Sequence, residues 1–88
     1  MSLFEPPVVC DLTPDEWDRF TRPVDAPEGG MGALWQTLHD RASERRLEAE
    51  DAELSKAYRY SYDYGGGGYQ GRFKALLSAA FRAGWCPP

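Results

Sequence analysis

The sequence predicts a small, mainly α-helical domain of three to four helices, and three observations support that fold class. Helix-capping residues stand around Thr13, apolar side chains recur at spacings of three and four in two later segments, and no Gly or Pro interrupts residues 33–64. The 88 residues suffice for one domain. A short two-stranded ribbon between the N-terminal arm and a tyrosine-rich segment is the alternative, and it would make the class α+β.

The first third of the chain is predicted to be an arm followed by a short helix. Residues 1–12 are expected to be extended, because two consecutive prolines remove backbone donors that a central strand needs. The helix is expected over 13–22, and its start combines a capping box with a proline at the first helical position: Thr13, Pro14 and Glu16. Pro23 ends it, because the residue before a proline avoids the α conformation.

A long, charged helix is predicted over 31–57. Its first half carries one apolar stripe, made of Met31, Leu34, Trp35, Leu38 and Ala42. The next apolar residue, Leu47, lies about 180° around the helix from Leu38. Two helices with a break within 40–46 would also fit, but we favour one long or kinked helix because the segment contains no Gly or Pro.

The last third is predicted to be a Tyr/Gly-rich segment, 58–71, and a C-terminal helix, 72–84. Alternating tyrosines favour a strand over 58–64. The final helix has an apolar stripe, and Gly84 is placed to cap its end. We expect one core, shared by Trp17, Trp35, Leu38, Phe73, Leu77 and Phe81.

The charge is unevenly distributed along the chain. Residues 1–55 hold five Lys or Arg and thirteen Asp or Glu, whereas residues 56–88 hold five Lys or Arg and one acidic residue. The formal net charge of −4 disfavours non-specific nucleic-acid binding by the whole chain. It leaves room for a local anion site in the basic last third.

Several classes of protein are disfavoured by what the sequence lacks. No apolar run approaches the roughly 20 residues that span a bilayer, and no secretion signal is recognisable, so we expect a cytoplasmic protein without membrane contact. Cys10 and Cys86 are then expected to be free thiols. No metal-ligand spacing is present, so neither a metal nor another cofactor is expected.

The candidate binding surface is the segment in which aromatic, glycine and cationic residues meet. Tyrosine and arginine are enriched in interface hot spots, and the four consecutive glycines at 65–68 favour free motion or close approach of a partner. The same residues suit nucleobase stacking or phosphate binding, which we keep as the alternative. The predicted binding residues are Arg59, Tyr60, Tyr62, Tyr64, Tyr69, Arg72 and Lys74.

A second candidate is an acidic ridge on the long helix, which could imitate a nucleic-acid backbone. Its residues recur at spacings of four, four and three: Asp40, Glu44, Glu48 and Asp51. For catalysis, His39 is followed by an aspartate, but adjacent residues do not face each other on a helix, and no catalytic set is recognisable. We therefore expect a small non-enzymatic regulator, an adaptor or inhibitor that binds another protein, and self-association is compatible with this function.

Overall fold

Four helices and a two-stranded antiparallel ribbon make up the part of the chain that the structure, a computed structural model, describes: residues 7–23, 29–62 and 68–87. The mainly helical class is therefore confirmed, with the ribbon as a minor element. In chain order the elements are β1 (Val8–Asp11), α1 (Pro14–Phe20), α2 (Gly29–Arg41), β2 (Arg46–Ala49), α3 (Asp51–Tyr62) and α4 (Gly68–Arg82).

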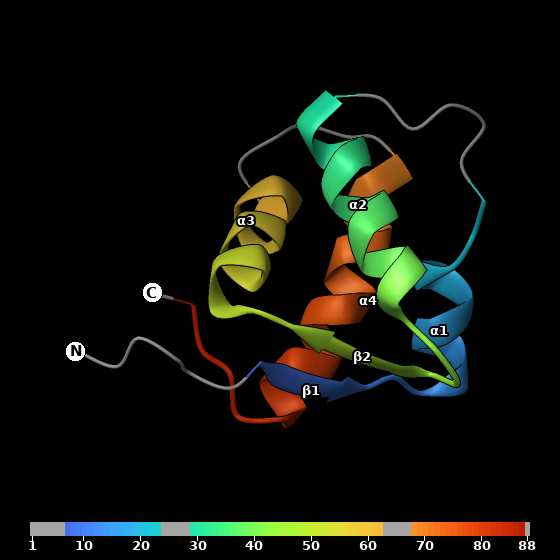
Figure 1. Cartoon of the computed structure of the whole chain (residues 1–88), viewed down its shortest axis with the longest axis vertical. Helices are drawn as coiled ribbons and strands as arrows, with labels where there is room; N and C mark the ends of the chain where they lie inside the picture. Colours follow the sequence, from blue (N-terminus) through green and yellow to red (C-terminus); the bar gives the residue numbers. More distant parts are fainter. Residues whose placement is uncertain (1–6, 24–28, 63–67, 88) are drawn as a thin grey trace.

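Helix α4 is the element on which most of the others pack. Figure 1 shows α3 and α1 flanking α4 on opposite sides, with the ribbon crossing near its C-terminal end. The closest helix pairs are α3 with α4 and α1 with α4, and β1 also packs on α4. The arrangement follows from the apolar stripe of α4, whose residues Phe73, Leu76, Leu77 and Ala80 are all buried.

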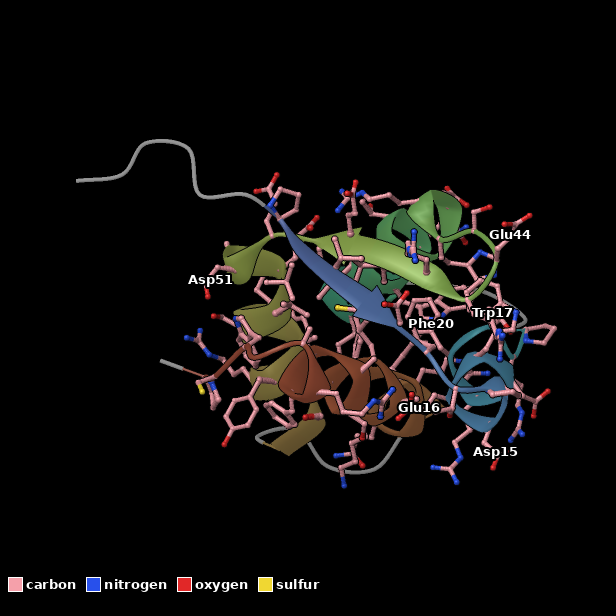
Figure 2. The ribbon with its side chains drawn as sticks, turned by 90° about the horizontal axis from the view of Figure 1, so that it is seen from below. Asp15, Glu16, Trp17, Phe20, Glu44 and Asp51 are labelled. Carbon is pink, nitrogen blue, oxygen red and sulfur yellow. The ribbon has the colours of Figure 1, made fainter. Side chains whose placement is uncertain are left out.

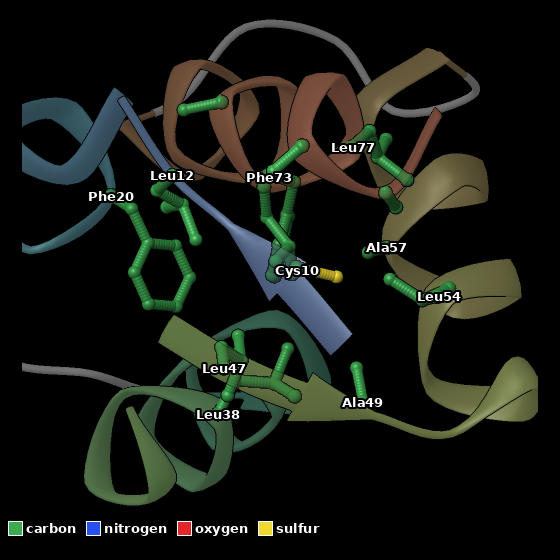
Figure 3. Packing of buried hydrophobic residues seen from close by; sticks show 14 of the residues in the cluster. Cys10, Leu12, Phe20, Leu38, Leu47, Ala49, Leu54, Ala57, Phe73 and Leu77 are labelled. Carbon is green, nitrogen blue, oxygen red and sulfur yellow. The ribbon is translucent and has the colours of Figure 1, made fainter. Parts of the chain in front are cut away.

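The ribbon pairs the N-terminal strand with a strand from the middle of the chain. Val8 lies opposite Ala49 and Cys10 opposite Leu47. Successive side chains of a strand point to opposite faces, and here Cys10, Leu47 and Ala49 point into the core (Figure 3). The tyrosine segment, which was the second strand in our alternative prediction of a ribbon, does not take part over its described residues, 58–62.

The outer edge of β1 is partly covered. Arg46 exchanges backbone hydrogen bonds with Ser43, so by the antiparallel alternation the backbone groups of Val9 and Asp11 point away from β2. The Asp11 carbonyl accepts a hydrogen bond of 2.9 Å from Arg82, and Pro7 has no N–H to offer at this edge. Proline and a covering side chain are two ways in which proteins protect a strand edge.

The prediction of one long helix over 31–57 is wrong. Helix α2 ends at Arg41, and a two-residue turn at Glu44 and Arg45, with φ of +50° and +64°, leads into β2. Positive φ is unfavourable for such residues and costs on the order of 1–3 kcal/mol each. The turn is stable because strand β2 buries both Leu47 and Ala49 on one face. If α2 continued as a helix, its displaced apolar stripe would not bury these two side chains.

The strand predicted over 58–64 is also wrong for its described part, because residues 58–62 complete α3. The buried positions of α3 are Leu54, Ala57 and Ser61, at spacings of three and four, and they face α4. This helical burial pattern overrides the tyrosine alternation, which leaves Tyr58 and Tyr60 half-buried. Tyr64 and the first glycines of the cluster lie outside the described residues.

Both predicted helix caps are confirmed. At Thr13 the side-chain oxygen accepts from the Glu16 N–H at 3.2 Å, and the Glu16 carboxylate accepts from the Thr13 N–H at 2.9 Å. After the C-terminal end of α4, Gly84 has φ +100°, and the Trp85 N–H donates to the Ala80 carbonyl at 3.0 Å. The Glu16 carboxylate also binds Arg82, whose hydrogen bonds hold the pKa of that carboxyl below its usual range.

The predicted core is correct for four of its six members. Trp35, Leu38, Phe73 and Leu77 are buried, and Trp17 is half-buried against the cluster; Figure 3 shows Leu38, Phe73 and Leu77 in the core. Phe81 was placed wrongly, since 43% of it is exposed and its ring stacks on Trp85 at 5.8 Å. The buried stripe of α4 is centred on other positions, and Phe81 falls at its margin.

The two cysteines are unpaired and differ in environment, which leads to a prediction about their reactivity. Cys10 is fully buried in the ribbon, whereas Cys86 is exposed. Burial, with the Asp11 charge, raises the pKa of the Cys10 thiol to about 11, so its reactive thiolate is scarce near pH 8.

Iodoacetamide at pH 8 should therefore label Cys86 in the folded protein and Cys10 only in denaturant, as followed by intact mass. Equal labelling rates in the folded state would contradict the burial, and failure of both to label in denaturant without reductant would reveal a disulfide.

Candidate functional site

Two of the predicted binding tyrosines lie in an aromatic cluster around Phe73. The Tyr60 ring stacks on Phe73 with a centroid distance of 6.0 Å, and the Tyr69 ring stacks on Phe73 at 6.3 Å. Tyr69 is also 6.3 Å from Trp35, so the cluster joins α2, α3 and α4. Both tyrosines are half-buried. They therefore have a packing role in addition to any role at the surface.

Arg72, one of the predicted binding residues, is instead a buried clamp between helices. Only 9% of the residue is exposed. Its Nε donates to the Arg22 carbonyl at 2.8 Å and its Nη2 to the Pro23 carbonyl at 2.9 Å. Its guanidinium also lies 5.9 Å from the Trp35 ring centroid. These contacts hold α4 against the C-terminal end of α1, where carbonyl groups favour a cation.

The other residues of the predicted binding segment do not form one described surface. Arg59 is exposed on α3 and Lys74 is exposed on α4. The side chain of Tyr62 and all of Tyr64 fall outside the described residues. The structure therefore brings Tyr60, Tyr69 and Arg72 together near Phe73 and Trp35, and leaves the two other cations on separate helices.

The acidic ridge does not exist as a helix face, because the helix that would carry it is interrupted. Asp40 lies at the end of α2, Glu44 in the turn, Glu48 on the outer face of β2 and Asp51 at the start of α3. Figure 2 shows Glu44 and Asp51 near opposite ends of the ribbon. Asp51 accepts a hydrogen bond of 2.8 Å from Trp85 Nε1, which gives it a structural role.

A groove with mainly apolar walls lies between α2 and α3, which stand side by side in Figure 1. Its volume is about 360 Å³. We call it the α2–α3 groove, and its lining residues are Gly30, Ala33, Leu34 and Thr37 of α2 and Ala52, Glu53, Lys56 and Tyr60 of α3.

Small residues explain why this groove is open. Ala33 and Ala52 are exposed and put only a methyl group between the two helices. At Gly30 an added Cβ would lie 2.8 Å from the Tyr60 hydroxyl, so a larger residue there would require the end of that side chain to shift. The two helices touch each other much less than α3 touches α4. Sequence reasoning missed these residues, because alanine and glycine on a helix carry no obvious functional signal.

The acidic side chain in the groove is paired with an arginine, whereas the basic side chain, Lys56, has no ion-pair partner among the described residues. The Glu53 carboxylate accepts hydrogen bonds from Arg41 Nη1 at 2.7 Å and from Arg41 Nη2 at 3.0 Å. This pairing lowers the pKa of the Glu53 carboxyl and offsets its charge. In the part of the chain that the structure describes, neither Lys56 nor Arg59 forms an ion pair. The rim of the groove therefore carries a positive side chain, Lys56, in a protein whose net charge is −4.

A larger depression, of about 530 Å³, lies at the turn between α2 and β2. Its walls are mainly charged side chains, and two of them, Arg46 and Asp11, already pair at 3.0 Å. A smaller one, of about 170 Å³, lies beside Arg19 and the Arg72 clamp. Hydrated charges are costly to bury, so neither depression offers the apolar area that drives association.

The described residues offer no metal site and no membrane-spanning helix, and known proteins offer no comparison. Across residues 7–23, 29–62 and 68–87, no group of three His, Cys, Asp or Glu residues could hold a metal ion. No helix within those ranges is both long and apolar enough to cross a membrane. Comparisons with protein-family models, with curated proteins and with solved structures found no match to this chain.

Proposed function

We propose that this chain is a small non-enzymatic binding protein, an adaptor or inhibitor, that acts on another protein through the α2–α3 groove. The observation that carries the proposal is an open groove with small, largely apolar walls between two helices that scarcely touch each other. Exposed apolar surface of this kind is stabilised when a partner covers it. The proposed location is the cytoplasm, where Cys86 would stay reduced.

A protein partner is favoured over a nucleic acid by the roles of the basic and aromatic residues. Arg72 is occupied by backbone carbonyls, and Tyr60 and Tyr69 each place a ring face on Phe73. These groups are then less suited to phosphate binding or base stacking. The acidic net charge also weakens long-range attraction to nucleic acid.

Site-specific crosslinking in cells that naturally contain the chain tests this proposal. A photoreactive residue at the exposed groove position Thr37 should give an adduct that protease removes and nuclease does not. The matched control carries the same group at Ser78, which is exposed on α4 outside the groove. Adding Ala52→Gln, which puts a longer neutral side chain into the groove, should abolish the Thr37 adduct. An absent adduct, a nuclease-sensitive one, or equal adducts from both positions would refute the proposal.

A further inference from the structure

We infer that the α2–α3 groove receives an amphipathic helix of the partner protein, with acidic residues along one flank of that helix. This inference rests on the protein-binding function proposed above and specifies its ligand. It concerns the shape of the groove, the backbone chemistry of its walls and the charge on its rim.

The length of the groove suits about two turns of a helix. On α2 the lining residues Gly30, Ala33, Leu34 and Thr37 follow the spacing i, i+3, i+4, i+7. They therefore extend over about two helical turns, or roughly 10 Å at 1.5 Å per residue. A helix that docks in a groove presents its own apolar anchors at the same spacing. The volume of about 360 Å³ suits a few such anchors.

The backbone of the walls favours a helix over an extended segment. Both walls are helices, whose backbone N–H and C=O groups are bonded to each other along most of their length. An extended peptide in the groove would find few main-chain partners, whereas a helix satisfies its own backbone. The strand edges that could pair with an extended peptide belong to the ribbon, outside the groove; Arg82 and Pro7 partly cover the edge of β1, and Arg41 donates to the Glu48 carbonyl at the edge of β2.

The charge of the rim specifies the polar side of the partner helix. Lys56 lines the groove, and Arg59, three residues further along α3, does not line it but is exposed on the same side of that helix. Arg41 already holds the Glu53 carboxylate, so that acid does not offset them fully. Complementary charge on the partner, from Asp or Glu beside its apolar anchors, would speed association and select against basic helices.

Selection of binders from a random 16-residue peptide library, displayed against the full chain, tests the inference without a known partner. Enriched peptides should carry apolar residues at i, i+3 or i+4, and i+7, with two or more Asp or Glu along one flank. A synthetic fluorescein-labelled copy of the most enriched peptide then serves as the probe, and its dissociation constant is measured by fluorescence anisotropy.

Two groove variants and one control decide the outcome. Ala33→Gln, which fills the groove with a neutral side chain, and the charge reversal Lys56→Glu with Arg59→Glu should each weaken binding at least about tenfold. Ser78→Gln should leave binding unchanged, and circular dichroism should show native helix content in all variants. The inference is overturned by no enrichment, by basic or proline-rich winners, or by a probe that is insensitive to the groove variants. If Thr37 still crosslinks to a protein in cells in those cases, only the identity of the ligand is wrong and the proposed function stands.

Discussion

Replacing Phe73 with Ala is expected to lower the free energy of unfolding by about 3–5 kcal/mol. Phe73 is fully buried in α4, and both Tyr60 and Tyr69 stack on its ring. Its removal leaves a cavity at the junction of three helices and takes away two ring contacts. A domain of this size has a total stability of about 5–15 kcal/mol, so the variant should unfold at much lower urea or not fold at all.

The matched control is Phe81→Ala, the same change on the same helix. Phe81 is 43% exposed and contacts Trp85 at the margin of the core, so we expect a loss of about 1 kcal/mol or less. Urea unfolding followed by far-ultraviolet circular dichroism gives both values. Equal losses of unfolding free energy for the two variants would contradict the assignment of Phe73 to the buried face of α4 and of Phe81 to its exposed margin.

Replacing Arg72 with Ala is expected to cost about 2–4 kcal/mol, although arginine is usually a surface residue. The change leaves the Arg22 and Pro23 carbonyls without the donor that now binds them, and it removes the cation from the Trp35 and Tyr69 rings. Arg72→Lys keeps the charge but cannot reproduce the planar fork, so most of the loss should remain.

Arg59→Ala is the control for the loss of one positive charge, because Arg59 is exposed on α3. It should change the free energy of unfolding by no more than about 0.5 kcal/mol. The same urea titration applies to all three variants. If Arg72→Lys were as stable as the unchanged protein, a positive charge alone would account for the clamp and the hydrogen bonds would be unimportant.

The local features of the fold were predictable from the sequence. The capping box at Thr13 and the glycine cap at Gly84 depend on residues within a few positions of each other, and both are present. The apolar stripe of the last helix was also recognisable, although its centre was displaced by about one residue toward Phe81. Short-range hydrogen bonds and helical spacing are determined by neighbouring residues, which explains this success.

The features that depend on distant parts of the chain were not predictable. Positive φ at Glu44 and Arg45 is unfavourable locally, and it is compensated by the burial of Leu47 against residues remote in sequence. Burial of Arg72 requires carbonyl groups fifty residues away. The α2–α3 groove depends on how far apart two helices lie, and its small residues, Ala33 and Ala52, are equally suited to a closely packed interface.

The pairing of β1 with β2 has a consequence for how the protein is made in the cell. Strand β1 is synthesised first, but its partner β2 ends at Ala49, and α4, on which β1 also packs, ends at Arg82. The ribosome holds the most recently made part of a growing chain in its exit tunnel, so β1 stays unpaired until β2 has left the tunnel. Local helices such as α1 can form earlier, since their contacts are close in sequence. The core is therefore completed only after the residues of α4 have left the tunnel, and until then Val8 and Val9 are accessible to chaperones.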